Sequence, residues 1–382
     1  MNWTPRRLTA AMLACCWLSG PLALGALNVT EETSRLALPS ATGFAARHAI
    51  AALRKHSVPI APLMKRAGIS EEDIDNRQAR ISALAQGKLL EYAAEALGDN
   101  EFGLHLAQQA NPREAGLLFY VASAAEHVGD ALALTARYCR IGNEAERLKV
   151  IRSSENMIVE TTFVGLPRHF AWQNTEFVMA ATIKALREMA GRHLQPAQVT
   201  FTLARNSELP EFERFFGCPV EFSASADQFT LSNGTLAIPL VTEDHNLLET
   251  LRPICEEAAK ERKTVHGSLR SLVENEVHKL LHHGKANRQR VAKALGLSAQ
   301  ILSEKLAEEN TSFDHVVDRL RRSLALQYVR EPSISLAQIA WLLGYEGPTS
   351  LNYAFTRWTG RSASETRNEQ PRPKVEPDPP PG

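Results

Sequence analysis

The chain has 382 residues and equal numbers of acidic and basic side chains, 43 of each. Its 44% hydrophobic and 23% charged residues are ordinary for a globular protein, which excludes only the disordered and fibrous classes. The charge is unevenly distributed, because residues 266–370 hold 14 Lys and Arg against 11 Asp and Glu, whereas residues 8–265 hold 25 against 30. A positive excess near the C-terminus has the sign of a nucleic-acid-binding surface.

The first 42 residues form an extension with the features of a secretory signal. Arg6 and Arg7 precede an uncharged stretch over residues 8–30, which is also near the length of a membrane anchor. A genuine signal would make the protein secreted or membrane-anchored, and this is the alternative function that the sequence leaves open. Because patterned sequence starts only near Gly43, we interpret the extension as the product of an upstream start and expect a cytoplasmic protein.

The five cysteines show no spacing that would suggest a metal site or a disulfide framework. They include no C-x-x-C pair and no histidine at zinc-ligand spacing, so we expect buried free thiols, no metal and no cofactor. These cysteines are Cys15, Cys16, Cys139, Cys218 and Cys255.

Residues 43–265 are predicted to form a mainly helical domain with a small antiparallel β region. Helical patterns fill residues 43–140, with Gly68 and Gly98 at expected helix ends and Ser70 as an expected cap. Alternating runs around residues 153–156 predict a hairpin, followed by a helix over about 170–192 and strands near 199–203, 220–222 and 229–231. The domain is therefore predicted to be α+β.

A basic and aromatic group precedes the predicted helix at residues 170–192. Arg168, His169 and Trp172 are candidates for lining a small-molecule effector pocket, with a purely structural role as the alternative.

Residues 266–368 are predicted to form an all-α domain with two helix-turn-helix units, at about 288–310 and 335–360. In the first unit Gly296 supplies the turn, Ser298 caps the next helix, and Leu302 and Leu306 face inward. A helix over residues 313–328 follows, and its apolar residues recur at helical spacing. As a rod of roughly 18 residues it would be ~27 Å long, so that two reading helices could reach successive major grooves.

The second unit repeats the plan of the first. Ser335 is the expected cap, Gly344 supplies the turn, and a helix over about 348–358 places Phe355 and Trp358 inward, with Trp341 also expected in the core. The second helix of such a unit lies in the major groove of DNA, so its outward residues are the candidates for base and phosphate contacts. These candidates are Ala299, Gln300, Ser303, Glu304, Pro348, Thr349, Ser350, Asn352, Tyr353 and Arg357.

Several segments resemble the DNA-binding domain of AraC/XylS-type transcription regulators. The resemblance is carried by residues 319–329, 334–345, 354–360 and 364–367. The segment from Gly43 through residues 112–120 and 137–139 also resembles the arabinose-binding-like effector domain found in one branch of that family. The resemblance implies a regulator that binds promoter DNA, responds to a small-molecule effector and often forms a homodimer. As an activator it would contact RNA polymerase.

The chain departs from the family pattern at three positions. The family usually has Arg where Glu304 stands, Gly where Asn310 stands, and Pro where Ala363 stands. An acid in place of Arg removes a phosphate contact, although Glu can accept from a cytosine amino group.

No stretch combines a nucleophile with a base or forms a phosphate-binding loop, and an enzyme is therefore not expected. Residues 369–382 are predicted to be a proline-rich disordered tail.

Overall fold

The computed structural model of the protein describes residues 39–368, apart from residues 77, 206–208, 263–267, 282–283, 285 and 332–333. The signal-like segment and the proline-rich tail lie outside the described residues. No helix in the described part is long and apolar enough to cross a membrane.

The N-terminal domain starts with a series of helices around a short β-ladder, in which β1 (Ser40–Ala41) pairs antiparallel with β2 (Ile81–Ser82). Gly68 and Gly98 end α2 and α4 with φ of 81° and 64°, the left-handed conformation that glycine adopts without a steric penalty. Ser70 forms a capping box with Asp73 at the start of α3. The sequence predicts these ends. The helices are α1 (Phe44–Lys55), α2 (Ile60–Ala67), α3 (Glu71–Asp75), α4 (Ala83–Leu97), α5 (Phe102–Gln109), η1 (Pro112–Ala115), α6 (Leu117–Ser123) and α7 (Val128–Gly142).

A five-stranded sheet follows, in the order β3-β4-β7-β5-β6. The predicted hairpin is present, since β3 and β4 pair from Glu146 opposite Phe163 to Arg152 opposite Met157. All pairs are antiparallel except β5 with β6, which the sequence pattern did not indicate. The strands are β3 (Glu146–Arg152), β4 (Asn156–Phe163), β5 (Gln198–Thr200), β6 (Val220–Glu221) and β7 (Gln228–Ser232).

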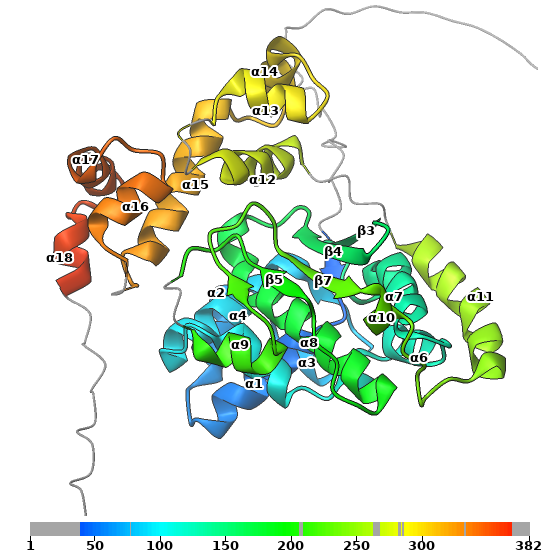
Figure 1. The fold of residues 1–382 in the computed structure, drawn as a ribbon. Helices are drawn as coiled ribbons and strands as arrows, with labels where there is room; N and C mark the ends of the chain where they lie inside the picture. Colours follow the sequence, from blue (N-terminus) through cyan, green and yellow to red (C-terminus); the bar gives the residue numbers. More distant parts are fainter. Residues whose placement is uncertain are drawn as a thin grey trace, which may run out of the picture. The chain divides into compact units, whose positions relative to one another are not determined.

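Helix α8 (Trp172–Ala190) forms the centre of the N-terminal domain (Figure 1). It belongs to the same buried cluster as the inward side chains of the sheet, including Val159 and Phe229. It also packs closely on α5, because a Cβ added at Gly103 would come within 2.3 Å of the backbone oxygen of Gln173. The remaining helices are η2 (Arg168–Phe170), α9 (Pro210–Phe216), α10 (Asn233–Leu236) and α11 (His245–Glu261).

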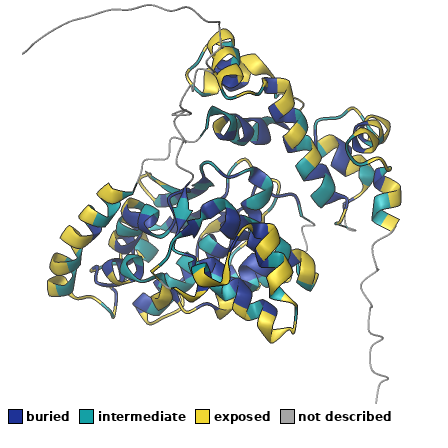
Figure 2. Cartoon of the chain, turned by 180° about the vertical axis from the view of Figure 1, so that it is seen from behind, coloured by how far each residue is buried: buried dark blue, intermediate teal, exposed yellow. Residues whose placement is uncertain are grey.

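The C-terminal domain contains only helices in its described part. Helix α15 has the bounds that the apolar spacing predicts. Each helix is amphipathic, with buried residues on one side and exposed residues on the other (Figure 2). The predicted fold class, an α+β domain followed by an all-α domain with helix-turn-helix units, is therefore confirmed. The helices are α12 (Leu269–Leu281), α13 (Arg288–Ala294), α14 (Ala299–Glu308), α15 (Phe313–Tyr328), α16 (Leu336–Leu342), α17 (Pro348–Thr359) and α18 (Ala363–Asn368).

Candidate functional site

The first helix-turn-helix unit consists of α13 and α14, joined by a turn at Gly296. This glycine has a φ of 70°, and the Ser298 hydroxyl caps α14 by accepting a 3.1 Å hydrogen bond from the Ile301 amide. Leu302 and Leu306 are fully buried, which fixes one side of α14 against the domain core. The opposite side of α14 therefore faces outward.

The outward side of α14 carries most of the residues that the sequence predicts there. Gln300 and Glu304 are exposed and are joined by a 2.9 Å hydrogen bond from Nε2 to Oε1. Ser303 is half-buried and accepts a 3.2 Å hydrogen bond from Arg288 of α13. Ala299 is half-buried and packs against the core, so it offers less surface than the other three.

Ile301 is a surface residue that was not among the predicted DNA contacts. Its side chain is 42% exposed on α14, although its neighbour Leu302 is fully buried. An exposed apolar side chain on a major-groove helix suits contact with a thymine methyl group. Its place on the flank of the helix, between inward and outward positions, is a signal that a helical projection of the sequence could have detected.

The second unit consists of α16 and α17, joined by a turn at Gly344. Ser335 and Gln338 form a capping box at the start of α16, in which the Ser335 amide donates to Gln338 at 2.8 Å. Gly344 has a φ of 70°, and a Cβ there would come within 2.6 Å of the Leu281 backbone oxygen. The turn thus requires glycine for its conformation and for the space beside the end of α12.

The outward side of α17 begins with three exposed residues, Pro348, Thr349 and Ser350. Tyr353 follows one turn later with 76% of its surface exposed. Arg357 is exposed in the last turn and forms an ion pair with Asp318 of α15.

Two residues of α17 are held by the domain. Asn352 is half-buried, and its Oδ1 accepts a 3.3 Å hydrogen bond from the amide of Ala363, the first residue of α18. Trp358 is half-buried and donates a 3.0 Å hydrogen bond to Asp318.

The expectation that Trp341 of α16 lies in the core was wrong, because this residue is 57% exposed. Phe355 of α17 is fully buried, as expected.

Helices α15 and α17 border an open hollow of about 530 Å³ with Arg321 and Arg357 in its wall. Thr349, Ser350 and Tyr353 line the same hollow. Two guanidinium groups beside hydroxyl donors are suited to the phosphates of a nucleic acid backbone. Arg321 was not among the residues predicted from the sequence to contact DNA.

The three effector candidates of the N-terminal domain lie in η2 and at the start of α8. Arg168 is buried and forms a 2.5 Å ion pair with Asp227, as well as a hydrogen bond to Thr202. The ring of His169 lies 4.0 Å from that of Phe170, and burial, the largest cause, lowers the pKa of His169 to about 4. Trp172 is 5% exposed. These contacts favour the structural alternative for the group.

A separate cavity of about 130 Å³ lies among the helices of the N-terminal domain. None of the three candidates lines it. Its wall is mostly apolar, which is typical of a small-molecule site. Most residues of this wall come from α1, α4, η1, α6, α7, β3 and α8.

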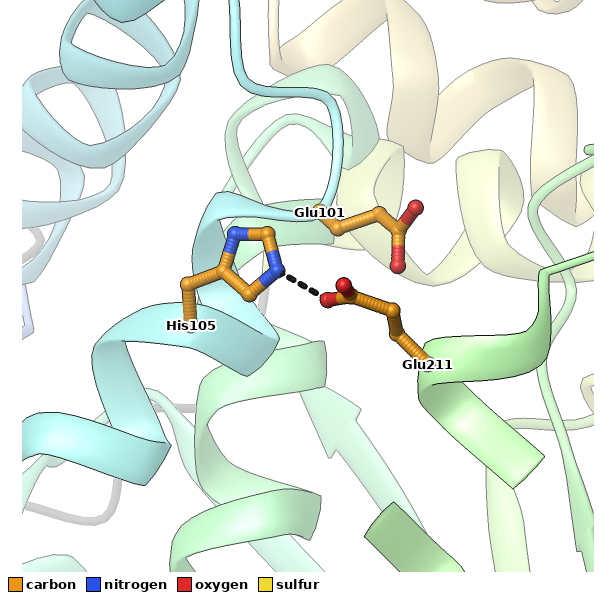
Figure 3. A group of neighbouring side chains, drawn as sticks. All are labelled: Glu101, His105 and Glu211. Atoms are coloured by element: carbon orange, nitrogen blue, oxygen red, sulfur yellow. Dashed lines mark hydrogen bonds and ion pairs between the residues drawn. The ribbon is translucent and has the colours of Figure 1, made fainter. Parts of the chain in front are cut away.

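A group of metal-ligand residue types occurs on the surface of the same domain. Glu101, His105 and Glu211 each place one ligand atom within 4.8 Å of the others (Figure 3). Nδ1 of His105 lies 2.8 Å from Asp99, and Nε2 lies 2.6 Å from Glu211. Burial lowers the pKa of His105, but the hydrogen bonds to the two carboxylates outweigh this and raise it, while the bond to His105 lowers the pKa of Glu211. Both shifts favour a charged imidazole between two carboxylates.

The two units, each with an exposed second helix, define a helix-turn-helix protein. Residues 58–240 match the family model described as the arabinose-binding domain of AraC transcription regulator, N-terminal, and residues 291–369 match a helix-turn-helix domain model. The chain is an AraC-type transcription regulator with an arabinose-binding-like N-terminal domain.

Known relatives match most of the chain. It is 26% identical over 312 residues to the Ornithine utilization regulator of Pseudomonas aeruginosa, covering 80% of this chain and 89% of that protein. It is 26% identical over 310 residues to the HTH-type transcriptional regulator VirS of Mycobacterium tuberculosis, covering 80% and 90%. The crystal structure of the transcriptional regulator CdpR from Pseudomonas aeruginosa aligns with a TM-score of 0.43 and 22% identity, over 85% of this chain and 98% of that chain.

Proposed function

We propose that α14 and α17 enter major grooves of promoter DNA and that a small molecule bound in the N-terminal domain changes this interaction. The observation that carries the proposal is that each second helix buries one side completely and leaves the other exposed. Leu302 and Leu306 anchor α14, whereas Leu351 and Phe355 anchor α17. A helix fixed in this way presents its outward side chains in a defined orientation, as base readout requires.

The two helices are proposed to divide the contacts. Gln300, Ser303 and Glu304 contact base edges from α14, with Ala299 and Ile301 supplying apolar contacts. Thr349, Ser350, Asn352 and Tyr353 contact bases or sugars from α17, and Pro348 sets the start of that helix. Arg357 contacts phosphate and exchanges its partner Asp318 for DNA. Helix α15 between the units has 16 residues and spans ~24 Å, a length that suits two neighbouring grooves.

A selection of bound duplexes from a random DNA pool tests this proposal. With the full chain we expect an enriched motif of two half-sites about 10 base pairs apart. Gln300→Ala should relax preference in one half-site only, and Tyr353→Ala in the other only. Arg54→Ala, at an exposed position on α1, is the matched control and should leave the motif unchanged. If no sequence is enriched over the starting pool, with or without metabolite extract, the proposal is wrong.

The effector site is proposed to be the cavity of about 130 Å³ and not the Arg168, His169 and Trp172 group. The cavity is mostly apolar and has space for a ligand, whereas Arg168 is already paired with Asp227. The test is DNA affinity measured by fluorescence anisotropy across a metabolite library. Ala181→Leu, which fills the cavity, should remove the response while keeping the DNA affinity of the ligand-free protein.

The mode of action, the location and the partners of the regulator are also part of the proposed function. The regulator is proposed to act by binding and not by catalysis, in the cytoplasm where the DNA is, and as a homodimer on its operator. As an activator it would contact RNA polymerase. Sedimentation with and without operator DNA tests the dimer, and transcription with purified polymerase tests the direction of regulation.

A further inference from the structure

The N-terminal cavity combines a benzene-sized space with polar groups whose hydrogen bonds are unmade. Its volume of about 130 Å³ is close to the ~150 Å³ of an engineered apolar cavity that binds benzene. Phe44, Leu118, Phe119, Phe177 and Met189 supply much of the apolar wall. A ligand whose apolar part is about the size of a benzene ring is therefore expected here.

Two amides line this cavity without satisfying their hydrogen-bonding capacity. Asn174 of α8 is 1% exposed, and neither its Oδ1 nor its Nδ2 has a partner among the described residues. Gln86 of α4 is 4% exposed, and its Oε1 also lacks a partner there. A buried polar atom left unpaired keeps the cost of losing its water without a compensating hydrogen bond. Because both amides border the same space, a bound molecule can supply the missing partners.

Side-chain oxygens that can accept hydrogen bonds line the cavity, together with the amide NH2 groups of Asn174 and Gln86. Thr135 and Thr182 each donate their hydroxyl hydrogen to a helix carbonyl, Ala131 and Val178, at 2.8 Å, so their oxygens can only accept a further bond. The amide oxygens of Asn174 and Gln86 are also acceptors. A group with several N–H donors can complement these oxygens.

Glu146, at the start of β3, sets the charge of the cavity. It is 8% exposed and is the one ionisable residue among the described residues that line the space. Burial raises the pKa of its carboxyl to about 8, and the neighbouring Arg147 counteracts this. Cys139 of α7 is the other titratable group that interacts with it. An anionic ligand would meet no lining cation, whereas a cation would meet a carboxylate.

We propose that this cavity binds a small, mainly apolar primary amine as its ammonium ion, with the Glu146 carboxylate as counter-ion and the Asn174 amide as a second hydrogen-bond partner. The inference rests on the proposed function in taking this amine as the effector of the regulator. The ammonium keeps its protons when it binds, and the Glu146 carboxyl releases its proton to solvent. Amine affinity should therefore rise with pH up to about 8.

Calorimetric titration of the full chain with three probes of one shape tests the ligand class. The probes are benzylamine, benzyl alcohol and benzoate, which share a ring and differ in the charge of the head group. We expect benzylamine to bind one to one and at least about tenfold more tightly than benzyl alcohol, with no binding of benzoate. Affinity for benzylamine should increase between about pH 6 and pH 8, while that for benzyl alcohol stays flat. Benzoate binding, equal affinities or no binding of any probe would overturn the proposal.

Two variants test the charge of Glu146 and the volume of the cavity separately. Glu146→Gln has nearly the same shape and should lose the preference for benzylamine and its pH dependence while still binding benzyl alcohol. Ala181→Leu should abolish binding of both. Should Glu146→Gln fail to fold by circular dichroism, the pH dependence of the unaltered protein decides, because a flat benzylamine profile overturns the role of Glu146.

DNA anisotropy in the same solutions separates this inference from the proposed function. If benzylamine binds with the predicted selectivity but leaves DNA affinity unchanged, the ligand class stands and the cavity is not the effector site. If a different metabolite changes DNA affinity while benzylamine does not bind, the regulator stands and the amine class is wrong.

Discussion

The guanidinium group of Arg321 donates a 2.9 Å hydrogen bond to the backbone oxygen of Leu343 and so ties the middle of α15 to the turn of the second helix-turn-helix unit. It also lies 4.8 Å from the centre of the Tyr345 ring and donates a 3.4 Å bond to Gly344. A short turn held from outside by a charged donor keeps α17 in one orientation relative to α15. The position of the proposed reading helix therefore depends on a residue outside the unit.

Arg321→Ala should lower the free energy of unfolding by about 1–2 kcal/mol, because a hydrogen bond to a charged group is lost. It should also weaken specific DNA binding, mainly at the half-site that α17 contacts. Urea denaturation and anisotropy measure the two effects. Arg322→Ala removes the same charge from an exposed neighbouring position and should leave stability unchanged. Equal stability losses in the two variants would contradict the assignment.

Arg357→Ala should weaken binding to every DNA sequence and reduce the slope of log affinity against log salt by about one. The reason is the loss of one phosphate contact. Asp318→Asn should instead strengthen binding to every DNA sequence. Its amide forms no ion pair with Arg357, so no ion pair has to be broken when Arg357 turns to the DNA. A salt titration of both variants on specific and random duplexes is the measurement, and unchanged slopes in both would dismiss the phosphate role.

Asn352→Ala is predicted to change base preference. Its hydrogen bond to the Ala363 amide predicts a second effect, a loss of about 1 kcal/mol in the stability of the C-terminal domain. Asn352→Asp keeps the acceptor and should restore stability, but it should not restore preference because the amide donor is gone. Duplex selection and thermal denaturation distinguish the effects. A motif that is unchanged in both variants would leave Asn352 with the structural role alone.

Asn310 ends the first reading helix with a φ of 54°, the conformation that glycine adopts freely. The family usually has Gly at this position, and the structure gives the physical reason. Asn310→Gly should raise the free energy of unfolding by roughly 0.5 kcal/mol, and Asn310→Ala should lower it by about 1 kcal/mol. Chemical denaturation of both variants tests the sign, and a stabilising alanine would show that the strain argument fails.

His105 should stabilise the N-terminal domain most in mildly acidic solution. Its raised pKa means that the contribution is present below the ordinary value of 6.5 and is lost as the pH rises through the folded value. The lowered pKa of Glu211 means that the contribution is also lost as the pH falls below about 4.5. The difference in melting temperature between the protein and His105→Gln should therefore be largest near pH 5–6. A difference that grows toward pH 8 would exclude the charged imidazole.

The sequence by itself determined the two helix-turn-helix units, the helix between them and the ends of several helices elsewhere. Ser298 and Ser335 cap the helices they were expected to cap, and Gly296 and Gly344 take the expected left-handed turns. These features are readable because they depend on interactions within four residues of the chain. The AraC-type motifs indicated the family from the sequence for the same reason, because each lies in a short continuous segment.

Tertiary structure decided which side chains are available to act. Arg168 pairs with Asp227, 59 residues away in the chain, and so is held in the fold instead of lining the cavity. Gln86, Glu146 and Asn174 come from separate elements and border one space only after α4, β3 and α8 have packed. Periodicity shows which side of a helix is apolar. Whether a polar side chain there finds a partner or faces a cavity depends on the elements that pack against it, and those are brought together only by folding.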